Sequence, residues 1–119
     1  IVLVDVKNPK TGIVKKTVSR DCVGRDAAVL LEKIGVKVGP DIRCIICETS
    51  FEHDFVQHEL MMPILTIVRV NNIDQAIDLA VKAEHGCRHS AHIHSKNVDR
   101  LTRFAREVET TIFVKNAPS

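Results

Sequence analysis

Histidine and cysteine side chains gather in one short stretch of the chain. His85, Cys87, His89, His92 and His94 fall within ten residues, and imidazole and thiolate are ligands that zinc prefers. The two last histidines would share one face of a strand, because side chains alternate along a strand. The spacing nevertheless matches no closed tetrahedral pattern such as paired Cys-x-x-Cys knuckles. We therefore expect no metal site, and expect these histidines to bind helix-end carbonyls or to face solvent or a pocket.

A second pair of sulfur side chains, Cys44 and Cys47, has the spacing of a redox motif. That motif works at a helix N-terminus, where the helix dipole lowers the pKa of a thiol. Here the pair lies in a β-prone run, so the two side chains would point to opposite faces. We expect buried structural thiols at these positions. We also expect Cys22 and Cys87 to be free, because disulfide frameworks belong to small secreted chains without an adequate core.

A carboxylate, Glu59, stands before Leu60-Met61-Met62-Pro63 at a predicted junction of loop and strand. A carboxylate in such a place can accept hydrogen bonds from both hydroxyls of a ribose, as acidic residues do in dinucleotide sites. A solvated loop glutamate followed by core-filling methionines is the default explanation of the same residues. Residue chemistry by itself therefore leaves the activity open.

Composition limits the class of protein that could carry these groups. The chain has 119 residues, of which 45% are hydrophobic and 27% charged, as in a single globular domain. A net charge of +2 and the lack of Trp and Tyr argue against a nucleic-acid partner. No run approaches the roughly 18 apolar residues of a membrane span, and the first apolar run is too short for a signal peptide. We expect a cytoplasmic protein that does not bind membranes.

Periodicity predicts the elements that position these residues, within one cooperative unit from residue 24 onward. Predicted helices cover 27–34, with Gly35 as the terminal cap, then 73 to the residues before Gly86, and a third segment from 97 to 108. Asn72 and Gln75 have the spacing of a capping box for the second helix. Predicted strands cover 43–47, 64–70, 90–95 and 111–115, with a polar loop at 48–58. Residues 1–6 resemble a strand, 8–12 a turn, and 13–18 either a strand or an extended arm.

Consecutive strand-helix-strand units require crossover connections, which produce parallel strands covered by helices. The predicted fold class is therefore α/β, an open and mostly parallel sheet with helices packed on it.

Several blocks of the chain, in order, resemble the aldehyde dehydrogenase family. The segment 59–65, Glu-Leu-Met-Met-Pro-Ile-Leu, is similar to the family's Glu-x-Phe-Gly-Pro-Val-Leu, and its Met-Met form resembles the CoA-acylating acetaldehyde and propionaldehyde branch. The likeness continues through 68–70, 74–77, 84–91, 94–101 and 110–116. It is good over 43–119, fair over 23–42 and poor before that. The resemblance implies that 1–119 is part of a catalytic domain, with 1–23 as a poorly defined arm and 24–119 as an α/β core.

The resemblance also implies a reaction. In that branch a cysteine attacks a short-chain aldehyde, hydride passes to NAD, and the thioester passes to coenzyme A. The cysteine lies well upstream of the Glu-x-x-x-Pro segment, so none of the four cysteines here occupies its position and the chain alone is predicted to be inactive. Glu59 resembles the glutamate that holds the nicotinamide ribose, and Met61 stands where most relatives have a Phe beside the nicotinamide. A glycine of the family is replaced by Met62, and the likeness assigns no role to His89 or His94.

The resemblance further implies a homo-oligomeric parent enzyme in the cytoplasm, within a bacterial microcompartment for some relatives. An alternative from a different class is a free-standing α/β binding or assembly module that uses the His/Cys segment for metal or partner recognition. Stoichiometric zinc in the purified chain, lost on replacing His92 and His94, would favour that alternative.

Overall fold

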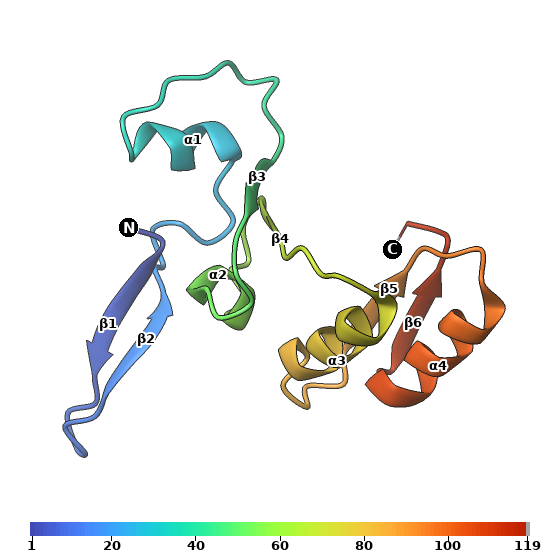
Figure 1. The fold of residues 1–119 in the computed structure, drawn as a ribbon. Coiled ribbons are helices and arrows are strands. Elements are labelled where there is room, and N and C mark those ends of the chain that lie inside the picture. Colours follow the sequence, from blue (N-terminus) through green and yellow to red (C-terminus); the bar gives the residue numbers. More distant parts are fainter. Residues whose placement is uncertain (119) are drawn as a thin grey trace. The chain divides into compact units, whose positions relative to one another are not determined.

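The computed structural model describes residues 1–118, in which four helices alternate with six strands (Figure 1). Contacts between Cα atoms divide the chain into two compact units, the first being Ile1–Arg69 and the second beginning at Val70. The strands of the first unit are β1 (Leu3–Lys7), β2 (Val14–Val18), β3 (Ile45–Glu48) and β4 (Ile64–Ile67), and its helices are α1 (Ala27–Glu32) and α2 (Asp54–Gln57). The second unit holds α3 (Ile73–Ala83), β5 (Ser90–Ile93), α4 (Val98–Val108) and β6 (Ile112–Lys115).

Residues 3–18 form an antiparallel hairpin, β1 with β2, in which Leu3 faces Val18 and Lys7 faces Val14. The Asn8 side chain closes the turn by accepting hydrogen bonds from two backbone N–H groups, those of Lys10 at 2.8 Å and Thr11 at 3.2 Å. This pattern is the Asx turn, which asparagine favours because its short side chain mimics a backbone carbonyl. The choice left open for 13–18 is thus decided in favour of a strand.

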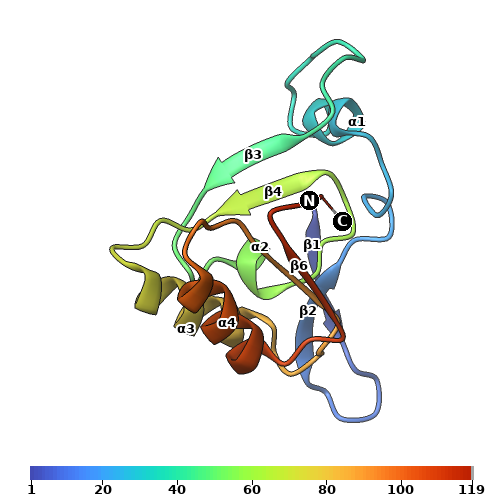
Figure 2. The ribbon, with the colours of Figure 1, turned by 90° about the vertical axis from the view of Figure 1, so that its right-hand side faces the viewer.

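The first parallel pair consists of β3 and β4, which lie side by side in Figure 2 and pair in register from Ile45 with Ile64 to Glu48 with Ile67. Half-buried and exposed residues alternate along both strands, as the two-residue period of a strand requires. The predicted polar loop between them contains α2, a helix that the sequence reading missed. A four-residue helix is too short for a periodic pattern, and it begins where the His53 side chain accepts a hydrogen bond from the Phe55 N–H at 3.1 Å.

Helix α1 is shorter than predicted, because it ends at Glu32. Its inward face consists of Ala27 and Leu30, both buried, whereas Ile34 lies beyond the helix and is exposed. Gly35 has a φ of +82°, the left-handed backbone expected just after a helix end.

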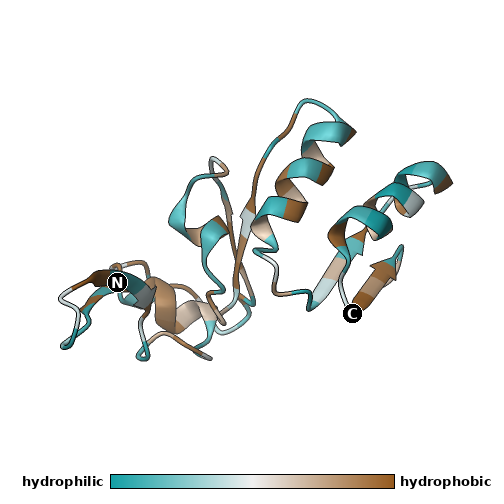
Figure 3. Cartoon of the chain, turned by 90° about the horizontal axis from the view of Figure 1, so that it is seen from below, coloured by the Kyte–Doolittle hydropathy of each residue, from teal (hydrophilic) through white to brown (hydrophobic). Residues whose placement is uncertain are grey.

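The second unit packs both of its helices on the parallel pair of β5 and β6. Its core is Ile77 from α3 with Phe104 and Val108 from α4, against which half-buried residues of both strands pack. Figure 3 shows hydrophilic and hydrophobic segments alternating along these helices, as in amphipathic helices that bury one stripe. Val98, in the first turn of α4, lies outside this core and is 70% exposed.

Asparagine begins both long helices. The Asn72 side chain accepts from the Gln75 N–H at 2.9 Å, and the Asn97 side chain accepts from the Arg100 N–H at 3.0 Å. The capping box predicted for α3 is thus confirmed on the Asn72 side, while the Gln75 side chain accepts from the N–H of Asn71 at 3.0 Å, one residue earlier than in the standard box.

The predicted α/β class is confirmed, and both pairs of core strands are parallel. Within residues 1–118 the strands form three two-stranded sheets. The antiparallel hairpin β1–β2 is the remaining sheet.

Candidate functional site

The turn between α2 and β4 carries the two predicted cofactor residues, Glu59 and Met61. It is anchored by Leu60, which is only 7% exposed, whereas Met61 beside it is 63% exposed. Met61 has a φ of +54°, in the left-handed region. A residue with a Cβ in that region costs about 1–2 kcal/mol, so surrounding contacts must hold it there.

Two backbone hydrogen bonds fix this turn to segments far away in the sequence. The Met61 carbonyl accepts from the N–H of Gly24 at 3.0 Å, and the Pro63 carbonyl accepts from the N–H of Ile45 at 2.8 Å. The carbonyl of proline can accept such a bond like that of any other residue. Proline has no N–H to donate, so Pro63 suits the position directly before β4. Together with the burial of Leu60, these contacts determine where the exposed side chains point.

Glu59 and Met61 line the same cavity, which has a volume of about 390 Å³. Its other walls come from α2, the turn and β4: Phe55, Val56, His58, Leu60, Met62, Ile64 and Thr66. The lining combines apolar side chains with one carboxylate, one imidazole and one hydroxyl, groups that can fix the orientation of a small molecule. The structure brings together the two residues that the sequence singled out.

The imidazole of His58 was not singled out from the sequence. Its Nδ1 lies 2.9 Å from the carbonyl oxygen of Asp54, and because a carbonyl oxygen only accepts, Nδ1 donates. In the neutral ring this leaves Nε2 as an acceptor. No spacing rule predicts this contact, since it depends on the short helix α2.

A charged pair ties the same helix to the N-terminal hairpin. The Lys16 ammonium, on β2, donates to the carboxylate of Asp54. This hydrogen bond holds the pKa of Asp54 below its usual value and raises the pKa of Lys16. The first residue of α2 therefore stays ionised beside the cavity through the neutral pH range.

The histidine and cysteine segment lies outside this cavity, in the turn before β5 and along that strand. His85 and Arg88 both have left-handed backbone, and Gly86 between them has a φ of +75°. His92 and His94 are exposed. Across residues 1–118, no three His, Cys, Asp or Glu side chains approach one another closely enough to hold a metal ion.

All four cysteines are free. Cys22 is buried and Cys47 is half-buried between β3 and β4, where its Sγ lies 3.8 Å from Thr66 Oγ1. The prediction of a buried thiol is wrong for Cys44, which is exposed because β3 begins one residue after it. None of the four lines the cavity of Glu59.

The helices of the described part are short, and among residues 1–118 none is long and apolar enough to cross a membrane.

Residues 23–119 match the aldehyde dehydrogenase family. The acetylating acetaldehyde dehydrogenase EutE of Escherichia coli K12 is 51% identical over 104 residues, which are 87% of this chain and 22% of that protein. The chain thus spans less than a quarter of the length of this curated relative.

Two solved structures resemble the chain closely. A propionaldehyde dehydrogenase from the fucose utilisation bacterial microcompartment of Clostridium phytofermentans superposes with a TM-score of 0.83 at 54% identity, over 95% of this chain and 25% of that one. The propionaldehyde dehydrogenase of Rhodopseudomonas palustris, with bound CoA and an acylated cysteine, superposes with a TM-score of 0.82 at 51% identity, over 85% of this chain and 23% of that one.

Proposed function

The chain belongs to the aldehyde dehydrogenase family, and from this premise we propose that it is part of the catalytic domain of an NAD-dependent, CoA-acylating aldehyde dehydrogenase. The parent enzyme would convert a short-chain aldehyde, CoA and NAD to acyl-CoA and NADH. The observation that carries the proposal is that Glu59, which matches the glutamate of the family's cofactor segment, lines one cavity with Met61, which replaces the Phe of that segment. The named relatives that act on acetaldehyde and propionaldehyde support the substrate class.

The residues of the cavity suit a nicotinamide nucleoside. The Glu59 side chain is exposed to the cavity and can accept hydrogen bonds from two ribose hydroxyls. The exposed Met61 side chain offers a polarizable apolar surface in the place where a planar ring would lie. Bound NAD would supply the hydride acceptor, while the protein would supply position and orientation.

The nucleophile of the proposed reaction is a thiolate that attacks the aldehyde carbonyl. A relative in this branch carries an acylated cysteine together with bound CoA. Within residues 1–118 no thiol lines the cavity of Glu59, so we assign the nucleophile to a part of the parent enzyme outside this chain. The chain by itself is then expected to bind without turnover.

The remaining features of the proposal concern the assembly and the location of the parent enzyme. We propose a homo-oligomeric enzyme of the cytoplasm that takes up a short-chain aldehyde and CoA and does not bind nucleic acid or membranes. One relative comes from a bacterial microcompartment, which supports a microcompartment as an alternative location for the parent enzyme.

The chain offers a direct test, since its only two methionines, Met61 and Met62, both line the cavity. The chain labelled with ¹³C in its methionine methyl groups should show two signals, and both should move saturably as NAD is added. Glu59→Gln should weaken this binding by about tenfold, because it removes a charge-assisted hydrogen bond. Glu52→Gln is the matched control, an exposed glutamate of the same unit that does not line the cavity.

A parallel test in the full-length enzyme follows NADH formation from acetaldehyde and CoA. The 119-residue chain should form no NADH, whereas the full-length enzyme should form it and should lose NAD affinity on Glu59→Gln but not on Glu52→Gln. Equal NAD affinity for the wild type and Glu59→Gln, in both experiments, would remove Glu59 from the site.

A further inference from the structure

The contact between Gly24 and Met61 joins the start of the α1 region to the candidate cofactor turn. The N–H of Gly24 donates to the carbonyl of Met61 at 3.0 Å. Both residues have left-handed backbone, with a φ of +67° for Gly24 and +54° for Met61. Such a backbone is common for glycine but rare for a residue with a Cβ.

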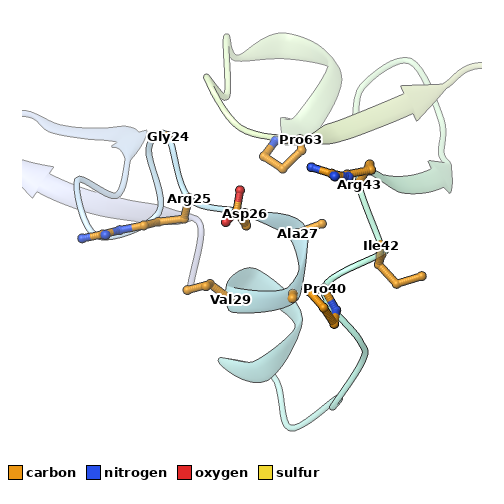
Figure 4. A pocket seen from close by; sticks show the side chains of 10 residues that line it. Gly24, Arg25, Asp26, Ala27, Val29, Pro40, Ile42, Arg43 and Pro63 are labelled. Atoms are coloured by element: carbon orange, nitrogen blue, oxygen red, sulfur yellow. The ribbon is translucent and has the colours of Figure 1, made fainter.

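Space is not the reason for a glycine at position 24. A Cβ added there would meet no atom within 4 Å. Gly24 instead lines a second cavity of about 390 Å³, together with Pro63 at the other end of the turn (Figure 4). The glycine is therefore required by its backbone angle, which aims the N–H at the Met61 carbonyl.

This hydrogen bond is accepted by the backbone of Met61 itself. Leu60 is fixed by burial and Pro63 by its bond from Ile45, on either side of Met61. The Met61 side chain is largely exposed, so packing holds it weakly. Without the bond from Gly24, the backbone of Met61 could relax to a negative φ, which would redirect its side chain relative to Glu59.

We propose that Gly24 is a positioning residue for the cofactor wall: its left-handed backbone holds Met61 in the orientation in which Met61 and Glu59 face one cavity. The inference rests on the proposed function for the identity of the ligand. The role of Gly24 itself is argued only from the hydrogen bond and the backbone angles.

The test compares Gly24→Ala with Gly35→Ala in both the labelled chain and the full-length enzyme. Gly35 is a matched control because it has a φ of +82°, lies in the same unit and has no atom within 4 Å of an added Cβ. Its N–H donates locally, to the carbonyl of Glu32 at 2.9 Å. Both variants introduce the same kind of backbone strain and should lower the melting temperature to a similar extent.

Only Gly24→Ala should shift the Met61 methyl signal of the unliganded chain and raise the KM for NAD, by about tenfold, with a smaller effect on the KM for CoA. Gly24→Asn should restore both readouts, because asparagine tolerates left-handed backbone. If Gly24→Ala fails to fold, Gly24→Asn can be compared with Gly24→Ser, because asparagine tolerates left-handed backbone better than serine does. The Met61 signal and the KM for NAD are then the two readouts of that comparison.

The two ways to fail are distinguishable. An unmoved Met61 signal, or equal KM values for NAD in Gly24→Ala and Gly35→Ala, would overturn the role of Gly24. A full-length enzyme that forms no NADH from acetaldehyde and CoA would overturn the proposed function, while a shift of the Met61 signal confined to Gly24→Ala would still uphold the contact.

Discussion

Replacing Phe104 by alanine should nearly abolish the stability of the unit that begins at Val70. Phe104 is 6% exposed and packs with Ile77 and Val108 in the core of that unit. Its ring lies edge-on to that of Phe113 on β6, with 5.7 Å between the ring centroids. The substitution therefore removes one of the two buried side chains of α4.

The magnitude follows from the area that the ring hides from water. A buried aromatic side chain covers about 150–250 Å², which at about 25 cal/mol per Å² corresponds to roughly 4–6 kcal/mol. A compact unfolded state reduces this figure by about 10–40%, giving about 2–5 kcal/mol, which overlaps the range of about 3–5 kcal/mol measured for Phe-to-Ala changes in cores. A unit of about fifty residues is stable by only about 2.5–7.5 kcal/mol, so the loss is comparable to the whole.

Urea unfolding followed by circular dichroism at 222 nm measures this effect, because the chain has no Trp or Tyr for fluorescence. Helices α3 and α4 contribute eleven residues each, against six and four for α1 and α2, so they dominate the helical signal. Val98→Ala is the control, since Val98 is on the same helix and 70% exposed, and its effect should stay within about 0.5 kcal/mol. Equal losses for Phe104→Ala and Val98→Ala would refute the assigned core.

Three further predictions concern other contacts. The hydrogen bond from Lys16 lowers the pKa of Asp54 in the folded chain, so the pair stabilises the fold above the ordinary carboxyl pKa of 3.8 and loses this effect as the pH falls through the folded pKa. The urea midpoint should therefore fall more steeply on acidification in the wild type than in Asp54→Asn. Parallel curves for the two proteins would contradict this. Asn72→Ala should cost about 1 kcal/mol by removing the N-cap of α3, while Asn72→Ser should cost much less, as urea unfolding can measure. Elemental analysis of the purified chain should find no stoichiometric zinc, and zinc lost on replacing His92 and His94 would instead favour the binding-module alternative.

Most elements were predictable, because their signals are local. The Asn72 cap and the apolar stripe behind it predicted α3 to within about two residues, and β5 and β6 followed from short apolar runs. The misses have physical causes as well. Helix α2 is a single turn fixed by the His53 side chain, and Ile34 was assigned to a helix that ends two residues earlier.

For the candidate site, the sequence by itself determined which residues to consider. The order Glu59, Met61 and Pro63 is encoded in one short segment, and its likeness to a family motif needs no coordinates. The sequence also determined the parallel α/β class, because alternating strand and helix periods leave few other arrangements.

Tertiary structure alone decided how that segment is held. The hydrogen bonds from Gly24 and Ile45 join this segment to residues many positions away in the chain, and one of them acts on the left-handed backbone of Met61. Sequence patterns report periodicity over a few residues, whereas a hydrogen bond between distant backbone groups leaves no periodic trace, since every residue except proline carries the same donor and acceptor.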